Sequence, residues 1–206
     1  MSLTLDSKEI KLKKIPQKYD VYIQNRVSED MLNSFKREIN NKISEIDDII
    51  EESIEQIKSL GFNIDNFQPT LPTFNIHVST YGGDVYAGLG ICDIITNLSK
   101  RFVVNIICSG HIMSMGIPII LSGTNIYAYE NTSFMIHEIA SGSWGKLSEL
   151  KEDIKEMERL NHIVNNIITT KTKINQEELN DWYAKKMDVY FSTSDALKYG
   201  IITKII

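Results

Sequence analysis

Short apolar runs alternate with amphipathic segments along most of this chain, and this alternation constrains the fold more than any other feature. The runs of strand length lie at residues 74–78, 102–108, 125–129 and 133–136. Apolar residues at helical spacing occupy residues 85–98 and recur over residues 147–164. Strands that alternate with helices over short connections predict right-handed crossovers and a largely parallel, buried sheet. The predicted fold class is therefore α/β.

The composition is that of a single globular domain spanning residues 1–206, because 206 residues with 42% hydrophobic content can bury a sizeable core. A formal net charge of −5 argues against nucleic acid or an anionic membrane as partner, since either would favour a basic face. The sequence has no apolar run of membrane-span length and no basic-then-apolar start, so we expect a cytoplasmic protein. Cys92 and Cys108 fall inside apolar runs and are expected to be core residues. We expect no metal and no cofactor.

A long amphipathic helix, or two such helices in line, is predicted at about residues 28–61, after a short strand at residues 21–23. Apolar residues recur every three or four positions from Leu32 to Leu60, and Gly61 supplies a stop. The apolar stripe is narrow. It is compatible with packing against a neighbouring subunit and equally with an ordinary surface helix on its own domain.

The last part of the chain is predicted to contain a helix around residues 177–185 and then a short helix that begins at a capping pattern. Ser192 and Asp195 form that pattern, and Gly200 ends the helix. Residues 201–206 are predicted to close the chain as a strand.

Ser114 is the first candidate for chemistry, because it lies between the apolar run 102–108 and another apolar stretch, within a predicted turn at residues 110–116. A strand, a tight turn and a helix beginning at a serine would hold its hydroxyl at a helix N-terminus, where amide donors stabilise an anion. Taken alone, such a serine is usually a plain N-cap. His137 at the end of the run 133–136, and Asp188 before a later turn, change this interpretation.

A serine hydroxyl needs a base that accepts its proton, and a carboxylate then orients the imidazole of that base. His137 ranks first of the four histidines, because it follows a buried run and precedes a loop at residues 138–145 that substrate could reach. His111 is a distant second: it is only three residues from Ser114, but it precedes the serine within the same predicted turn. His77 lies in a predicted strand and His162 in a predicted helix. A structural role for a histidine at a strand end stays an open alternative.

Backbone amides near Ser114 are candidates for stabilising an oxyanion. Gly82 and Gly83 follow a predicted strand and lead into a helix, so their amides are expected to point outward at the carboxyl edge of the sheet. The amide of Met115 lies beside the nucleophile. A di-glycine alone is more often only a turn.

The joint order of these motifs resembles the Clp protease proteolytic subunit. The matching segments cover roughly residues 74–206, and they are residues 76–83, Gly88 with residues 91–93, residues 110–116, residues 135–137, and residues 188–200. The resemblance implies the ClpP/crotonase-like α/β fold of repeated β-β-α units with a protruding handle helix. It also implies a serine endopeptidase in which Ser114 is the nucleophile, His137 the general base and Asp188 the orienting acid. The amides of Gly83 and Met115 would form the oxyanion hole.

The same resemblance implies an assembly and a mode of substrate binding. It implies a homo-oligomer of heptameric rings that stack as a tetradecamer, and an AAA+ unfoldase that feeds in unfolded polypeptides. Substrate would add as a strand between the segment after the histidine and the segment after the di-glycine, which supplies main-chain hydrogen bonds with little sequence preference. The implied substrate-binding residues are Gly82, Asp84, Val85, Ile139, Ala140 and Ser141.

Five positions depart from the family pattern. Tyr81 stands where the family usually has proline, Asp84 where an apolar residue is usual, and Glu138 with Ile139 where Gln-Pro is usual. These changes predict an altered specificity. Met187 replaces the usual arginine before the aspartate, which bears on ring pairing, and the longer amino-terminal helix bears on unfoldase coupling.

Two other functions are compatible with the sequence. A crotonase-type acyl-CoA enzyme would share the fold and a two-amide oxyanion hole, but it does not need the combination of Ser, His and Asp. A non-enzymatic structural or regulatory subunit is the other alternative, because the substrate cleft is altered.

Overall fold

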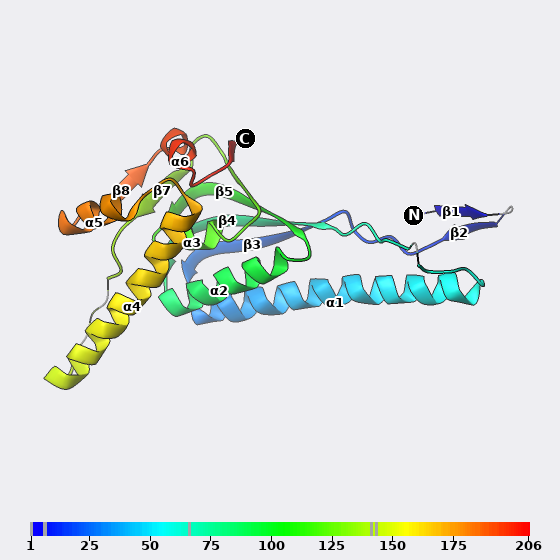
Figure 1. Ribbon diagram of the computed structural model, residues 1–206, viewed down its shortest axis with the longest axis horizontal. Helices are drawn as coiled ribbons and strands as arrows, with labels where there is room; N and C mark the ends of the chain where they lie inside the picture. Colours follow the sequence, from blue (N-terminus) through cyan, green and yellow to red (C-terminus); the bar gives the residue numbers. More distant parts are fainter. Residues whose placement is uncertain (1, 6–7, 66, 141, 143) are drawn as a thin grey trace.

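The computed structural model describes residues 2–5, 8–65, 67–140, 142 and 144–206, with side chains from residue 12 onward. The elements in chain order are β1 (Ser2–Leu5), β2 (Lys8–Lys11), β3 (Lys18–Val27), α1 (Glu29–Ser59), β4 (Thr73–Gly83), α2 (Val85–Leu98), β5 (Val103–Met113), α3 (Gly116–Ile120), β6 (Asn125–Ala128), β7 (Ser133–Ile136), α4 (Leu147–Lys171), α5 (Gln176–Ala184), β8 (Val189–Phe191), α6 (Thr193–Tyr199) and β9 (Lys204–Ile205). Figure 1 shows them as a central sheet from which α1 and α4 project in different directions.

The central sheet is largely parallel, as predicted. Its strand order is β3-β4-β5-β6-β9, and every pair along this path is parallel. β7 pairs in parallel with β5 at the end that β6 leaves free, and β8 then pairs with β7 in the antiparallel sense. A separate antiparallel hairpin of β1 and β2 lies at the far end of the molecule (Figure 1).

Alternation along the strands divides the sheet into a buried face and a partly exposed face. On β4, for example, Phe74, Ile76 and Val78 are fully buried, whereas the residues between them are only half-buried. The helices α1, α2 and α3 cover the buried face. Cys92 and Cys108 belong to this core, and burial raises the pKa of the Cys92 thiol to about 12. The prediction that both cysteines are core residues is confirmed.

The partly exposed face carries a row of amide hydrogen bonds across four strands. The Asn125 side chain donates to Asn105, Asn105 donates to Asn75, and Asn75 donates to Asp20, at 2.9, 3.1 and 3.2 Å. Each residue stands in register with the next, so the row fixes the alignment of the strands on this face. His77 lies next to this row and contacts Asp20 as well.

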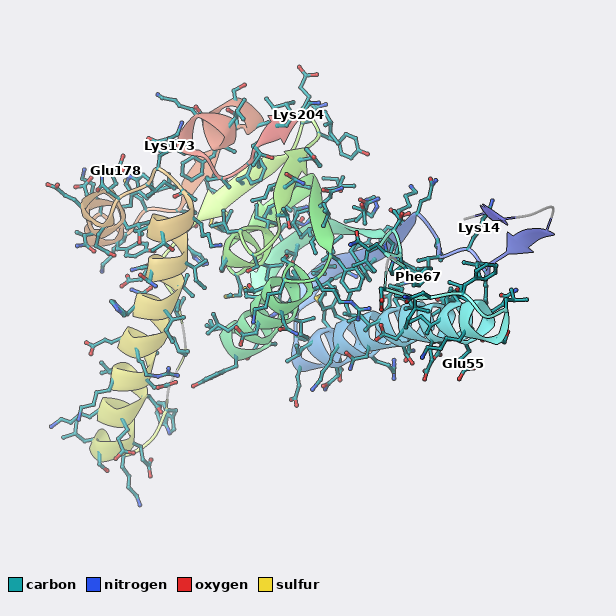
Figure 2. All side chains as sticks on the ribbon, turned by 45° about the vertical axis from the view of Figure 1, so that its right-hand side comes forward. Lys14, Glu55, Phe67, Lys173, Glu178 and Lys204 are labelled. Carbon is teal, nitrogen blue, oxygen red and sulfur yellow. The ribbon has the colours of Figure 1, made fainter. Side chains whose placement is uncertain are left out.

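α1 is one continuous helix and not two helices in line. It begins after Ser28, whose hydroxyl accepts a hydrogen bond from the Met31 amide. Of its buried residues, Phe35, Ile39 and Ile46 belong to the main core of the chain. Beyond the sheet, Ile57 packs with Leu12, Ile64 and Phe67. Figure 2 shows Phe67 and Lys14 on the side of α1 opposite to Glu55.

The strand ends differ from the prediction. β4 continues through Gly83 and β5 through Met113, whereas the sequence predicted strand runs that end at residues 78 and 108 and a turn from Gly110. The reason is pairing: β3 follows β4 as far as Gly83, and β7 pairs with the last residues of β5. The predicted helix at Ser114 is also shorter and later, since α3 has five residues and its N-cap is Met115.

The predicted closing strand at residues 201–206 is reduced to β9. Gly200 ends α6 with a φ of 74°, and the amides of Ile201 and Ile202 both bond back to the Ala196 carbonyl. Because these two amides bond to the end of α6, they are not available for strand pairing, which begins only at Lys204.

α4 extends from the body as a projecting helix (Figure 1). Its second half packs on the core through Leu160, Val164 and Ile168. Leu147 and Ile154 in its first half are 70% and 54% exposed. Among the described helices, none is both long enough and apolar enough to cross a membrane.

Candidate active site

Ser114 lies directly after β5 in a strained backbone conformation. Its φ is +53°, which is the left-handed region that a non-glycine residue rarely adopts. Its amide donates to the Met135 carbonyl at 2.9 Å, so the turn is fixed to β7. The Ser114 carbonyl accepts from the Ile117 amide at 3.0 Å. These bonds hold the hydroxyl at the carboxyl end of β5, beside the end of β7.

His137 is the residue that meets this hydroxyl. It follows β7 immediately, and its Nε2 lies 2.7 Å from Oγ of Ser114. The ring is partly buried, with 29% of its side chain exposed. At this distance a neutral imidazole protonated on Nδ1 accepts the serine proton. The ranking of His137 above the other histidines agrees with this geometry.

Asp188 reaches the other side of the imidazole through strand pairing. Ile136 stands opposite Val189 in the antiparallel pair of β7 and β8, so the adjoining His137 and Asp188 come together. Asp188 Oδ1 lies 3.7 Å from His137 Nδ1, within ion-pair range but longer than a hydrogen bond. The carboxylate is 56% exposed.

The di-glycine packs its backbone against the serine turn. A Cβ on Gly82 would lie 2.7 Å from Ser114 Cβ and 2.9 Å from the Met115 nitrogen, so only glycine fits here. The Gly82 amide donates to Thr80 Oγ1 at 3.0 Å. The expectation that both glycine amides point outward was therefore wrong for Gly82, because its hydrogen is used within the strand end.

A cavity of about 420 Å³ opens over these groups. Gly83, Ser114, Met115 and His137 line it, and Val164 and Ile168 of α4 form part of its apolar wall. A wider cavity of about 880 Å³ adjoins it, on the other side of Gly83 and Val85. The two cavities share lining residues and form a continuous cleft.

Most of the substrate-binding residues implied by the resemblance lie along this cleft. Gly82, Val85, Ile139 and Ala140 line the smaller cavity. Asp84 lines only the wider one, and its carboxylate caps α2 by accepting from the Ala87 amide at 2.7 Å. Ser141 lies outside the described residues.

The other three histidines lie elsewhere. His111 is a residue of β5, in register with Ser133, and its ring stacks on Tyr81 at 3.7 Å between centroids. His77 is in β4 and His162 in α4. The prediction that His111 shares a turn with Ser114 was wrong, because pairing with β7 continues the strand through it.

Arg26 is a cleft residue that the sequence did not reveal. It lines both cavities, near the end of β3. The predicted strand at residues 21–23 stopped before it, and its placement depends on a register shift between Gln24 and Arg26. Asn25 was the sequence signal for this irregularity. Its φ is 71°, and asparagine is one of the few residues that tolerate this conformation.

Comparison with known proteins agrees with this geometry. The family model for Clp protease matches residues 26–206. The chain belongs to the Clp protease family. A curated relative, the ATP-dependent Clp protease proteolytic subunit of Deinococcus radiodurans, is 32% identical over 133 residues, which are 64% of this chain and 63% of that protein. The aligned part therefore spans less than two thirds of that relative's length.

Structural comparison supports the same fold. ClpP1 of Listeria monocytogenes, in a single-substitution mutant form, matches with a TM-score of 0.64 and 22% identity, over 91% of this chain and 90% of that one. The predicted ClpP/crotonase-like α/β fold is confirmed. In the part of the chain that the structure describes, no three His, Cys, Asp or Glu side chains gather in a way that could hold a metal ion.

Proposed function

We propose that this chain is a Clp-type serine endopeptidase that hydrolyses peptide bonds of unfolded polypeptides. The observation that carries the proposal is the 2.7 Å approach of His137 Nε2 to Ser114 Oγ at the floor of a cleft. Family membership supports the same activity. A crotonase-type enzyme needs no such contact between a hydroxyl and an imidazole, so the geometry favours hydrolysis over acyl-CoA chemistry.

In the proposed mechanism, Ser114 Oγ attacks the carbonyl carbon of the scissile bond while His137 Nε2 accepts the hydroxyl proton. The tetrahedral intermediate then collapses. The C–N bond breaks, the proton passes from Nε2 to the departing amine, and an acyl ester remains on Ser114. A water molecule then attacks the ester carbonyl while His137 Nε2 accepts one of its protons. The ester C–O bond to Oγ breaks, this proton passes from Nε2 to Oγ, and the new carboxyl end is released.

Asp188 acts on this reaction through His137. An ionised carboxylate on the Nδ1 side favours the tautomer whose free Nε2 faces the serine, and it stabilises the imidazolium that forms. At 3.7 Å it is not in direct hydrogen-bond contact, so we expect it to move closer when substrate closes the cleft. Asp188 is thus an orienting residue.

The amides of Gly83 and Met115 are the proposed oxyanion donors. Both residues line the catalytic cavity, and the Met115 nitrogen faces the Gly82 backbone beside Ser114. Fixed backbone donors stabilise the developing oxyanion without reorganisation. The Gly82 amide is excluded from this role because it already donates to Thr80.

The cleft supports binding of the substrate as an added strand. Val85, Ile139 and Ala140 line both cavities, so an extended peptide between these segments would cross the serine. Main-chain hydrogen bonds hold such a strand with little sequence preference. The proposed substrate-binding set is Gly82, Asp84, Val85, Ile139, Ala140 and Ser141.

We further propose a homo-oligomer of heptameric rings, fed by an AAA+ unfoldase. The bare apolar side chains of Leu147 and Ile154 on the projecting half of α4 support contact between copies, because a second copy would remove them from water. Stacking of two rings into a tetradecamer is part of this proposal. Native mass spectrometry of the purified chain and of a Leu147→Gln/Ile154→Gln variant tests it, and an unchanged assembly in the variant argues against a role for this face.

The direct test of the activity is hydrolysis of quenched fluorescent peptides by the wild type and by Ser114→Ala. The wild type should cleave, and the variant should lose cleavage by at least about 10⁴-fold, because the nucleophile is gone. Ser109→Ala, a serine of the same strand β5, is the matched control and should cleave normally. Normal cleavage by Ser114→Ala would exclude the mechanism, and no cleavage by the wild type would favour a structural subunit.

A further inference from the structure

Arg26 occupies the boundary between the two cavities of the cleft. It lines the catalytic cavity together with Ser114 and His137, and it lines the wider cavity together with Glu29 and Glu156. Among the described residues that line the catalytic cavity, Arg26 is the one that carries a permanent charge. Its position therefore decides the electrostatic character of the space beside the reacting serine.

The backbone is built to place this side chain. The ladder between β3 and β4 shifts register between Gln24 and Arg26, and the residue between them, Asn25, has a φ of 71°. Thr80 Oγ1 donates to the Asn25 carbonyl and accepts from the Gly82 amide, which fixes the irregularity to the di-glycine. An irregularity of this kind re-aims a side chain next to an active site.

The stem of Arg26 passes directly over Gly83, the proposed oxyanion donor. A Cβ added to Gly83 would lie 2.9 Å from Arg26 Cγ. Arg26 itself is exposed, and no hydrogen bond or ion pair joins its guanidinium to another residue in the described part of the chain. Its five donors are thus available to a ligand.

Glu156, one of the acidic residues that line the wider cavity together with Arg26, is engaged by other groups. Glu156 accepts hydrogen bonds from Arg159 and from Tyr86 at 2.7 Å, and these bonds lower the pKa of Glu156 to about 2. The Glu156 carboxylate therefore forms its ion pair with Arg159. Among the described residues that line the catalytic cavity there is no carboxylate, so an acidic substrate side chain beside Ser114 meets the Arg26 guanidinium, whereas the carboxylates line the wider cavity.

We infer that Arg26 is a specificity-determining residue, which binds an aspartate or glutamate side chain of the substrate close to the scissile bond. This inference rests on the proposed function, because it takes the cleft to be the path of the peptide. The planar guanidinium binds a carboxylate through two parallel hydrogen bonds. The main-chain hydrogen bonds of the substrate peptide provide the remaining affinity. The preference is confined to the one substrate position that faces Arg26.

The test uses sets of quenched peptides that are identical except for Glu, Gln or Lys at each position flanking the cleaved bond. At one position the wild type should show a kcat/KM for Glu about three- to tenfold above that for Gln. Arg26→Gln should bring this ratio close to one, and Arg26→Glu should invert the preference toward Lys. Added salt should reduce the wild-type ratio, because the pair is partly exposed to solvent. Arg37→Gln, which removes an equal charge from α1 outside the cleft, should keep the wild-type ratio.

Binding measurements separate a failure of this inference from a failure of the proposed function. Fluorescence anisotropy of the labelled Glu and Gln peptides on Ser114→Ala, with and without Arg26→Gln, reports selectivity without hydrolysis. A Glu preference that disappears with Arg26→Gln supports the role of Arg26 even if the wild type cleaves nothing. Equal affinities for Glu and Gln at every position, or a preference that Arg26→Gln leaves intact, would overturn it.

Discussion

Among the residues that the structure describes, two contacts join a histidine to an aspartate, and they differ in distance and in surroundings. On the partly exposed face of the sheet, His77 Nε2 lies 3.0 Å from Asp20 Oδ1, and the imidazole stacks on Tyr22. At the end of β7, His137 Nδ1 lies farther from its aspartate, at 3.7 Å from Asp188. In the closer pair, no serine or cysteine of the described residues forms a hydrogen bond with the histidine.

This difference shows that a histidine and a carboxylate do not by themselves make an active site. His77 and Asp20 are neighbours in adjacent strands, and their contact belongs to the hydrogen-bonded row that continues through Asn75. His137 instead uses its second nitrogen for Ser114, in a cavity lined by Gly83 and Met115. The hydroxyl and the backbone donors, which the His77 site lacks among described residues, set the two apart.

Replacing each histidine should give the largest contrast. His137→Gln should lower kcat by about 10⁴-fold or more, because nothing else accepts the serine proton at this position. His77→Gln should leave kcat unchanged, since His77 lies within β4 and lines neither cavity of the cleft. Steady-state hydrolysis of one fluorescent peptide measures both. Equal losses in the two variants would show that the comparison is mistaken.

Replacing each aspartate should give a smaller contrast. Asp188→Asn should lower kcat by about a hundred- to a thousandfold, less than the about 10⁴-fold seen for a buried, directly bonded aspartate, because Asp188 is more than half exposed. Asp20→Asn should not change kcat. Pre-steady-state acylation with an ester substrate measures the effect on the chemical step. A normal acylation rate in Asp188→Asn would remove Asp188 from the mechanism.

Gly82, whose backbone packs against Ser114, tests the part of the site that holds the serine and the Met115 amide. Gly82→Ala should lower kcat by about a hundredfold, because its Cβ would displace Ser114 and the Met115 amide. Gly61 has nearly the same φ, +80° against +83°, with no atom within 4 Å of an added Cβ. Gly61→Ala therefore isolates the backbone strain, and it should reduce the free energy of unfolding by about 1 kcal/mol with normal activity. Equal activity of the two variants would contradict the crowding at Gly82.

The smallest effect is expected at Asp20, as a change in stability with pH. The hydrogen bond from His77, followed by those from Asn75 and Lys18, lowers the pKa of Asp20. Because the folded pKa is below the unfolded one, the contribution is present above about pH 4 and is lost as the pH falls through the folded pKa. Its size should stay below about 1 kcal/mol, since the carboxylate is partly exposed.

Urea unfolding of the wild type and Asp20→Asn at neutral pH and near pH 3 measures this contribution. The variant should be slightly less stable at neutral pH, and the gap should shrink in acid. A gap that grows as the pH falls would have the wrong sign for a carboxylate with a lowered pKa.

The sequence predicted the fold and the three candidate site residues because both depend on local pattern. Buried strands such as β5 are nearly continuous apolar runs, and Ser114, His137 and Asp188 stand next to strand ends. Their convergence could be expected only through the resemblance. Its physical cause is the antiparallel register of Ile136 with Val189, which no local pattern encodes.

The features that the sequence did not predict depend on contacts between strands. β5 continues to Met113 because β7 pairs with it, and the Gly82 amide turns inward because Thr80 accepts its hydrogen. Arg26 enters the cleft through a register shift that one strand alone does not show. Each of these depends on a partner strand that lies far away in the sequence.

Labelling with a fluorophosphonate probe tests the central claim most directly, because the probe reacts with a serine only where a base activates it and donors receive the new oxyanion. Mass spectrometry of peptides from the labelled wild type should place the adduct on Ser114, and His137→Gln should abolish it while His77→Gln retains it. A wild-type protein that stays unlabelled, or that carries the adduct on another serine, would contradict the account.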